Sequence, residues 1–324
     1  MTEHSKIAPV SGSTIERAGL AFGSSGFAPA PVPDNLRRPI TRRPLAAKAP
    51  LRQALAQEAA PKSEAIPEPA APALPVLRID GQVHPIDRDA LAKHGLIIPE
   101  AQVSALLEEF RIVKRRVLKA MRKAQENGVG ELAQRILVCS PLPEEGKSFC
   151  AVNLAIALAA EKDSEVLLVD ADFAKPSVLS MLGLPGGDGL MDVLANPSIN
   201  LEDCVIRTDI AGLSVLSAGN HTNSDSEFLA SHRTQQVLDA LTRGAPNRVV
   251  IFDSPPALAA SPAAELANHV GQAIVIARAD RTGQSALEDA LTLLSACPDI
   301  KLLLNAAHFS PSGRRFGAYY GQEG

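Results

Sequence analysis

The residues with the clearest potential for chemistry are Gly146, Lys147 and Ser148. The apolar segment 136–139 before them predicts a buried strand, and the residues from about Gly146 onward predict a helix. Backbone N–H groups in such a loop and at the helix N-terminus attract an anion, which the helix dipole also favours. A lysine at this position reaches phosphate oxygens and a serine hydroxyl binds Mg²⁺. The arrangement therefore predicts a site for the phosphates of a nucleotide.

The glycine-rich pattern G-x-x-x-x-G-K-[S/T] is incomplete, because Pro141 occupies the position of its first glycine. Gly-Lys-Ser alone is common by chance, so the prediction depends on what surrounds it. A strand before the loop, a helix after it and acidic strand ends further along the chain form the context in which this motif binds phosphate. We therefore expect a P-loop over residues 140–148.

Three carboxylates follow two further apolar segments. Asp170 and Asp172 end the segment from 164, and Asp253 ends the segment from 247. Ligands of open parallel sheets bind at the carboxyl ends of the strands. Mg²⁺ prefers hard oxygen ligands and is usually held by one or two protein groups plus phosphate oxygens. Together with Ser148, the set fits Mg–ATP, although a single such carboxylate is often only a helix N-cap or a turn residue.

Strand-like and helix-like segments alternate along the rest of the chain. Hydrophobic residues make up 46% and aromatic residues 3%, so the core must consist of Leu, Val, Ile and Ala. Further strands are predicted at 213–216, 272–278 and 301–305, and further helices at 99–123, 190–194, 231–243, 262–268 and 284–296. This order predicts an α/β protein, a P-loop NTPase with a mostly parallel sheet covered by helices on both faces.

The two ends of the chain differ from this central part. Residues 1–75 are rich in Pro and Ala without periodicity, which predicts a disordered head before an ordered domain at 76–305. The basic stretch 36–48 is either a solvated linker or a contact for anionic lipid or an acidic partner. A flexible tail is predicted at 306–324. It carries the chain's only two tyrosines, Tyr319 and Tyr320, in a Gly/Arg/Ser-rich context that leaves them available as phosphate acceptors.

Composition and charge narrow the function classes. A formal net charge of −4 gives no overall nucleic-acid-binding signature. We find no signal-peptide pattern and no apolar run near the ~20 residues that span a bilayer. The four cysteines are widely spaced, as expected for reduced, buried thiols, and no His/Cys pair has zinc-ligand spacing. These features predict a cytoplasmic location.

Within the helix predicted at 99–123, Glu108, Arg111 and Lys114 follow each other at intervals of three, which places them near one face. They form either a ladder of ion pairs within the helix or contacts with a neighbouring subunit. Periodicity does not distinguish these alternatives.

Several of these segments occur together in a known family. The segments 140–148, 167–172 and 249–256, the 108/111/114 helix and the tyrosine-bearing tail resemble, in this order, the bacterial tyrosine kinases (BY-kinases) of exopolysaccharide and capsule export. The resemblance covers about residues 76–324. The ending 312–321 is most similar to the free-standing cytoplasmic autokinases of exosortase-type polysaccharide loci.

The resemblance implies a protein-tyrosine autokinase that uses ATP and Mg²⁺, phosphorylates its C-terminal tyrosines between subunits and regulates exopolysaccharide export. It implies a ring-like homo-oligomer assembled through Glu108, Arg111 and Lys114. Its implied partners are a transmembrane polysaccharide copolymerase, which activates it and recruits it to the inner membrane, and a tyrosine phosphatase, with no nucleic acid.

The resemblance also implies roles for individual residues. Lys147 holds phosphate, and Ser148, Asp172 and Asp253 hold the metal. Asp170 is the base or orienter for the tyrosine hydroxyl, whose ordinary pKa near 10 requires a nearby carboxylate for transfer. Asn305 is a candidate adenine contact through its amide or else a turn residue. The predicted nucleotide contacts are Glu145, Gly146, Lys147, Ser148, Phe149 and Asn305.

Some positions depart from the family pattern. Glu144 replaces a glycine, and its carboxylate would repel a polyanion by about 4 kcal/mol at ~4 Å and an effective dielectric of ~20. Glu144 must therefore point into solvent, or ATP binds weakly. Ala174 and Lys175 stand where the family usually has arginines, and relatives often have more than two tail tyrosines.

Two other function classes stay open. The first is an ATP-driven positioning switch of the partitioning-ATPase type, which carries a signature lysine at the position of Leu142; that lysine is absent here. The second is a non-catalytic ATP-binding scaffold of an export complex, which Glu144 supports.

Overall fold

The computed structural model of the protein describes residues 74–222 and 224–307. The predicted head lies outside this range except for residues 74 and 75, and the predicted tail except for residues 306 and 307. Within the described part, eight strands form one sheet in the order β1-β4-β5-β3-β6-β2-β7-β8. All neighbouring strands are parallel except β4 and β5. The predicted, mostly parallel sheet is confirmed.

The strands are short, and β2, β5 and β6 are buried at every residue. Their bounds are β1 Val83–His84, β2 Arg135–Cys139, β3 Glu165–Asp170, β4 Val205–Thr208, β5 Leu213–Leu216, β6 Arg248–Asp253, β7 Gln272–Arg278 and β8 Ile300–Asn305. Because successive side chains of a strand point to opposite faces, Ile136 and Val138 of β2 join one core cluster and Leu137 and Cys139 join the other.

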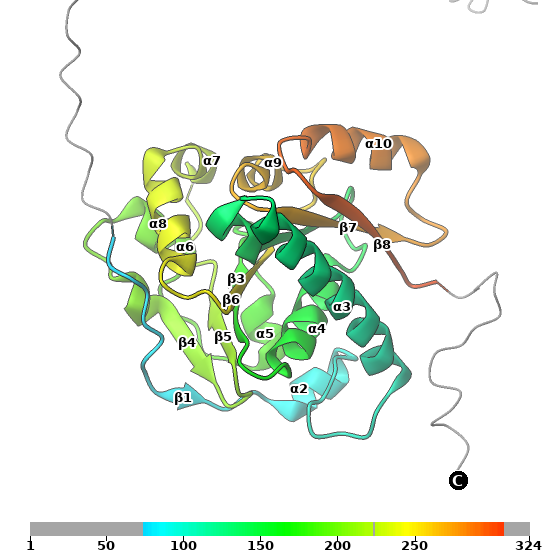
Figure 1. Cartoon of the computed structure of the whole chain (residues 1–324), viewed down its shortest axis with the longest axis horizontal. Coiled ribbons are helices and arrows are strands. Elements are labelled where there is room, and N and C mark those ends of the chain that lie inside the picture. Colours follow the sequence, from blue (N-terminus) through cyan, green and yellow to red (C-terminus); the bar gives the residue numbers. More distant parts are fainter. Residues whose placement is uncertain (1–73, 223, 308–324) are drawn as a thin grey trace, which may run out of the picture. The chain divides into compact units, whose positions relative to one another are not determined.

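Helices cover both faces of the sheet (Figure 1). Residues of α2, α3, α4 and α5 pack in one apolar cluster, and residues of α6, α7, α8, α9 and α10 pack in the other. The helices are α2 Arg88–Lys93, α3 Ala105–Glu126, α4 Lys147–Ala159, α5 Val178–Leu182, α6 Leu190–Ala195, α7 Asp225–Leu229, α8 His232–Thr242, α9 Pro262–Ala267 and α10 Gln284–Leu293, with 3₁₀ turns η2 Gly130–Gln134 and η3 Leu201–Cys204.

The helix predicted at 99–123 begins six residues later, at Ala105, and ends at Glu126. Ser104 is its N-cap, and the Ser104 hydroxyl accepts a hydrogen bond from the N–H of Leu107 at 3.2 Å. Val103, expected on the apolar face, lies before the helix and is exposed. Sequence reasoning also missed β1, α2, α5, β4 and α7, which have at most six residues and too few repeats to show a period.

The three charged residues of α3 do not form one ladder. Glu108 and Arg111 form an ion pair within the helix. Lys114 instead contacts Glu161, just beyond α4, with 2.6 Å between Nζ and Oε1. Within one chain, Glu108 and Arg111 thus form the intrahelical pair and Lys114 pairs outside the helix, while their contacts with a neighbouring subunit stay a prediction.

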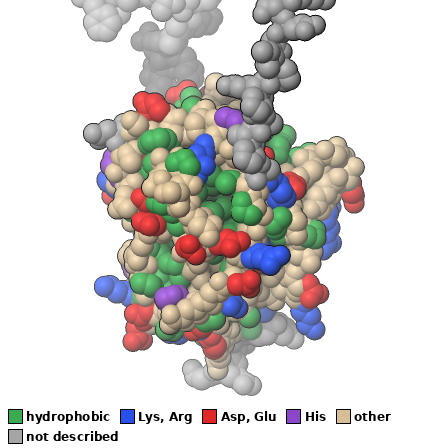
Figure 2. Space-filling view, turned by 90° about the vertical axis from the view of Figure 1, so that its left-hand side faces the viewer, with side chains coloured by type: hydrophobic (Ala, Val, Ile, Leu, Met, Phe, Trp, Pro, Cys, Tyr) green, Lys and Arg blue, Asp and Glu red, His purple; other side chains and the backbone are tan. Residues whose placement is uncertain are grey.

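All four cysteines are buried and none forms a disulfide, as expected. Burial raises the pKa of the Cys139 and Cys150 thiols to about 12, which leaves them protonated and unreactive. On the β1 side of the molecule, acidic and basic side chains are interspersed with apolar ones (Figure 2). Among the described helices, none combines the length and the apolar character that crossing a bilayer requires.

Candidate functional site

The loop after β2 leaves the middle of the sheet, where β2 lies between β6 and β7. It ends at Gly146, the N-cap of α4, which has a φ of 92°. A Cβ atom at this position would lie 2.1 Å from Nδ2 of Asn305. No side chain caps α4, so the N–H groups of its first turn stay available for an anion. The backbone conformation therefore favours glycine here, and any larger residue would also displace the Asn305 amide.

Glu145 holds the loop from inside. Its side chain is fully buried, and its carboxylate accepts hydrogen bonds from the N–H of Leu142 at 2.8 Å and from the hydroxyl of Thr282. Its carbonyl oxygen accepts a hydrogen bond from Nδ2 of Asn305 at 2.9 Å. The loop is thus anchored to the segment after β7 and to the end of β8.

Two predicted nucleotide contacts are engaged within the protein. Oδ1 of Asn305 accepts a hydrogen bond from the N–H of Ala306 at 2.8 Å, so both polar atoms of the amide have partners. The ring of Phe149 packs edge-on against Phe110 of α3, with 6.5 Å between ring centroids. Contacts of these two residues with a nucleotide stay predictions.

Glu144 points away from the loop. Its side chain is 78% exposed and pairs with Arg281 at 3.2 Å, while its carbonyl oxygen accepts a hydrogen bond from Nη1 of Arg278 at 2.9 Å. Its φ of 62° lies in the left-handed region that favours glycine, the residue of the family pattern. Of the two alternatives drawn from the sequence, the structure shows the one in which this carboxylate faces solvent.

The structure brings Lys147 together with the acidic strand ends. Asp170 and Asp253 are register partners at the ends of the neighbouring strands β3 and β6. Asp172 lies two residues beyond β3, and its Oδ2 is 2.8 Å from Nζ of Lys147. Burial alone would lower the lysine pKa, but the surrounding carboxylates outweigh it and raise the pKa. Lys147 therefore stays charged at neutral pH.

Asp253 is the least satisfied group of the site. Its side chain is 0% exposed, and neither carboxylate oxygen has a hydrogen-bond partner among the described residues. Burial raises its pKa to about 7, although the charge of Lys147 and the nearby Ser148 hydroxyl act to lower it. A buried carboxylate without partners is costly, and a cation would compensate it.

The donor set therefore fits Mg²⁺. In the described residues, no group of three or more His, Cys, Asp or Glu side chains is arranged as a complete metal site. Mg²⁺ needs only one or two protein ligands when phosphate oxygens supply the others. The Ser148 hydroxyl and the carboxylates of Asp172 and Asp253 offer such oxygens beside the phosphate-binding loop.

Asp170 has a structural task in this arrangement. Its Oδ1 accepts a hydrogen bond from the N–H of Asp172 at 3.1 Å, and its Oδ2 accepts from the N–H groups of Ser177 at 2.9 Å and Val178 at 3.0 Å. Burial raises the pKa of Asp170, although the three hydrogen bonds act to lower it. The contacts fix the loop that carries Asp172. The role of Asp170 as base or orienter for the tyrosine hydroxyl stays a prediction.

Sequence reasoning did not select Arg278, Arg281 or Thr282. The three residues contact Glu144 and Glu145 from the segment at and after the end of β7. Finding them requires the knowledge that β7 is the neighbour of β2, and strand order is not visible in hydrophobic periodicity. The only available signal was the position of Arg278 at the end of the predicted strand 272–278, with Arg281 and Thr282 just after it.

A Gly-Lys-Ser loop between a central strand and a helix, beside the acidic ends of two neighbouring strands, defines a P-loop NTPase. In agreement, the ParA family model, described as NUBPL iron-transfer P-loop NTPase, matches residues 131–285.

Curated relatives narrow this class. The chain is 33% identical over 172 residues to the tyrosine-protein kinase ptk of Acinetobacter johnsonii, which covers 53% of this chain and 23% of that protein. It is 32% identical over 162 residues to the tyrosine-protein kinase YwqD of Bacillus subtilis, which covers 50% of this chain and 67% of that protein. The solved BceF tyrosine kinase domain is similar with a TM-score of 0.53 and 28% identity, covering 68% of this chain and 82% of that domain.

The chain belongs to the bacterial tyrosine-protein kinase family. It spans 23% to 27% of the length of the first curated relatives that it matches, so the activity of those whole proteins is not carried over directly.

We predict that Gly146→Ala destabilises the protein more than Gly130→Ala does. Both glycines have positive φ, which costs another residue about 1–2 kcal/mol, but a Cβ at Gly130 meets nothing within 4 Å. Only the Cβ of the first variant displaces the Asn305 amide from its hydrogen bond to the Glu145 carbonyl, so this variant should lose about 1 kcal/mol more. Urea denaturation measures both losses, and equal losses would contradict the close approach of Asn305 to the loop.

A second prediction concerns pH. The pKa of Asp253 in the folded protein is about 7, above its ordinary value of 3.8. Between these two pKa values the folded state binds more protons than the unfolded state. The stability that this carboxyl contributes is therefore complete below about pH 4 and is lost as the pH rises through 7. In metal-free buffer, Asp253→Asn should be more stable than wild type at pH 8, on the order of a few kcal/mol, with a smaller difference at pH 5.

Thermal unfolding at the two pH values measures this difference. The control is Asp289→Asn, which removes an exposed carboxylate of α10 and should give the same small effect at both. A stability difference between Asp253→Asn and wild type that does not change with pH would contradict a raised pKa of Asp253 in the folded protein.

Proposed function

We propose that the chain is an ATP-dependent protein-tyrosine kinase that phosphorylates its own C-terminal tyrosines between copies. The observation that carries the proposal is Asp253, a fully buried carboxylate without a hydrogen-bond partner, beside Lys147 and Ser148 at the end of a phosphate-binding loop. Membership of the tyrosine-protein kinase family supports the choice of tyrosine as acceptor.

In this proposal each side chain has a defined task. Lys147 exchanges its contact with Asp172 for phosphate oxygens. Ser148, Asp172 and Asp253 hold Mg²⁺ at the ends of β3 and β6. When bound, Mg–ATP supplies the phosphoryl group, and the metal neutralises charge that develops on it. Asp170, the carboxylate outside this metal set, takes the proton of the tyrosine hydroxyl, whose oxygen forms the new bond to phosphorus as ADP leaves.

The acceptors would be Tyr319 and Tyr320, which lie outside the described residues. Their segment follows β8 directly, and Asn305 at the end of β8 contacts the loop through Glu145. The tail therefore starts beside the proposed site. Transfer between copies, rather than within one chain, is the alternative favoured by the resemblance to BY-kinases.

The wider setting is part of the same proposal. Glu108, Arg111 and Lys114 would contribute to a ring-like homo-oligomer, in which Arg111 and Lys114 exchange their present partners for those of a neighbouring copy. A transmembrane polysaccharide copolymerase would activate the kinase and recruit it from the cytoplasm to the inner membrane, and a tyrosine phosphatase would reverse its action. Regulation of exopolysaccharide export follows from these partners.

A positioning ATPase is the second candidate, and the match to the ParA model favours it. Such ATPases use a lysine at the position of Leu142. Here the backbone N–H of Leu142 is bonded to the buried Glu145, and the apolar side chain carries no charge for a phosphate. This difference favours the kinase.

We predict that purified protein incubated with Mg–ATP gains phosphotyrosine, detected by immunoblot and mass spectrometry. Lys147→Met should abolish the signal because the phosphates lose their cation, and Tyr319→Phe/Tyr320→Phe should leave little or none. Lys93→Met, at an exposed lysine of α2, is the control and should keep the signal.

Mixing the two inactive variants tests transfer between copies. The Lys147→Met chain keeps acceptors and the double tyrosine variant keeps the site, so the mixture should phosphorylate the Lys147→Met chain. ATP hydrolysis without phosphotyrosine would support the positioning ATPase. ATP binding without turnover would support a non-catalytic scaffold.

A further inference from the structure

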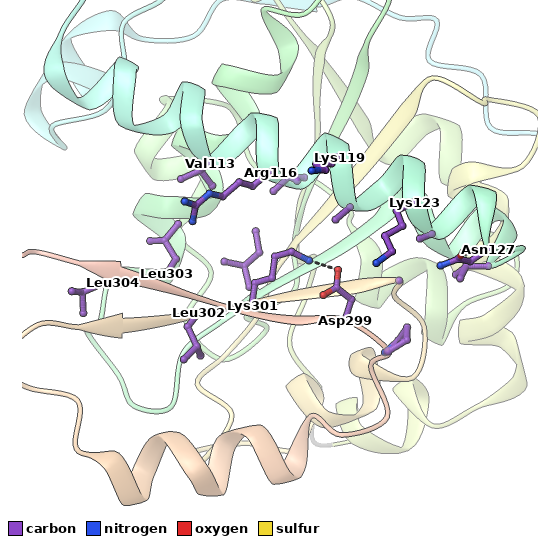
Figure 3. A pocket seen from close by; sticks show the side chains of 17 residues that line it. Val113, Arg116, Lys119, Lys123, Asn127, Asp299, Lys301, Leu302, Leu303 and Leu304 are labelled. Carbon is purple, nitrogen blue, oxygen red and sulfur yellow. Dashed lines mark hydrogen bonds and ion pairs between the residues drawn. The ribbon is translucent and has the colours of Figure 1, made fainter. Parts of the chain in front are cut away.

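A groove of about 900 Å³ runs between α3 and the free edge of the sheet at β8 (Figure 3). Its α3 wall includes Arg116, Lys119 and Lys123, and its other wall is β8 from Lys301 to Leu304. The proposed phosphoryl-transfer site lies at the strand ends, so the groove is a separate surface.

β8 is an edge strand, because its single neighbour in the described sheet is β7. The carbonyl oxygens of Asp299 and Asn305 accept hydrogen bonds from the β7 side. In a parallel pair the backbone groups of alternate residues face the same neighbour, so residues 301 and 303 also face β7. The N–H and C=O groups of Leu302 and Leu304 therefore face away from β7, along the free edge.

The side chains of this edge are unusually apolar. Leu302 is 55% exposed and Leu304 is 63% exposed. Leu303 is directed toward α3 and packs against the core there, whereas Leu302 lies on the side of α10 (Figure 3). Long, apolar and unprotected edges pair readily with another strand, and native sheets usually block them with charge, proline or a covering segment.

The opposite wall is strongly basic. Lys119 follows Arg116 by three residues and Lys123 follows Lys119 by four. This spacing places the three side chains on one face of α3. All three are exposed, and none has a carboxylate within 4 Å among the described residues. Asp299, the acidic residue of the groove, is already paired with Lys301. The free edge of the sheet thus has unpaired positive charge beside its α3 face and exposed apolar side chains on its α10 face.

We propose that β8 receives an extended acidic segment of a partner protein, which adds to the sheet as a ninth strand. Because its side chains would alternate between the two faces, its acidic residues would meet Arg116, Lys119 and Lys123, and its apolar residues would lie beside Leu302 and Leu304. Backbone hydrogen bonds to Leu302 and Leu304 would fix its register. The proposal does not depend on the kinase activity.

Other occupants satisfy fewer of these groups. A second copy of the edge would bring two basic α3 helices close together, and the charges would repel. An anionic lipid surface would neutralise the lysines but would not provide partners for the strand edge inside a concave groove. The combination of free backbone groups, exposed leucines and unpaired cations fits an acidic strand.

The test uses the full chain and a fluorescent ten-residue peptide of alternating Glu and Val, with binding measured by anisotropy. We expect saturable binding that weakens with salt and is lost when lysine replaces glutamate in the peptide. Lys119→Glu/Lys123→Glu should weaken binding at least tenfold. The matched control, Arg115→Glu/Arg122→Glu, reverses two cations of α3 outside the groove and should change binding less than threefold.

Backbone pairing has its own test. Two peptides carry N-methyl groups at either the odd or the even positions, and one of them alone should lose binding, because only one set of N–H groups faces β8. Leu304→Pro removes a backbone N–H that faces away from β7, so this variant should also weaken peptide binding. The melting temperature of the variant reports whether the fold is kept.

Several results would overturn the proposal. These are equal weakening by both double charge reversals, equal loss or equal retention of binding with the two N-methyl peptides, and no peptide binding under conditions where anionic vesicles bind. Dimerisation that Leu304→Pro abolishes would instead assign the edge to a second copy.

Discussion

The ion pair between Lys147 and Asp172 is the contact on which the site depends. It joins the first residue of α4 to the segment after β3, and the unpartnered carboxylate of Asp253 lies beside it. One ammonium therefore balances a cluster of buried acids. Such a cluster is stable only if positive charge stays within it. A magnesium–phosphate group adds positive charge at the carboxylates and negative charge at the lysine, which makes the present pair exchangeable.

The rest of the fold holds these charges in place. The central strands are buried on both faces, so their ends are fixed relative to one another, and the three strands that carry the site are neighbours in the sheet. Glu145 and Asn305 tie the loop to the end of β8. Asp170 ties the segment with Asp172 to the start of α5. Glu145 and Asp170 thus both position the loops that carry the site.

The sequence was sufficient to predict the long, buried elements and the residues at their ends. The strand before Gly146 and the strands that end in Asp170 and Asp253 are apolar runs with clear boundaries. Parallel strands of one sheet bring their carboxyl ends to the same edge, so the residues at these ends were expected to lie at one site. Strand order was not predictable, so the contacts of Arg278 and Arg281 with the loop were missed. The side-chain partner of Lys114, Glu161, was also missed, because helical spacing describes one helix and not its neighbour in space.

The most direct test of the central claim is a crystal structure of the protein with Mg²⁺ and a non-hydrolysable ATP analogue. The account predicts that Nζ of Lys147 leaves Asp172 for the phosphates and that the metal lies about 2.1 Å from the Ser148 hydroxyl oxygen, on the side of Asp253. A nucleotide bound elsewhere, or bound at the loop with the Lys147–Asp172 pair intact and no metal beside Asp253, would contradict it.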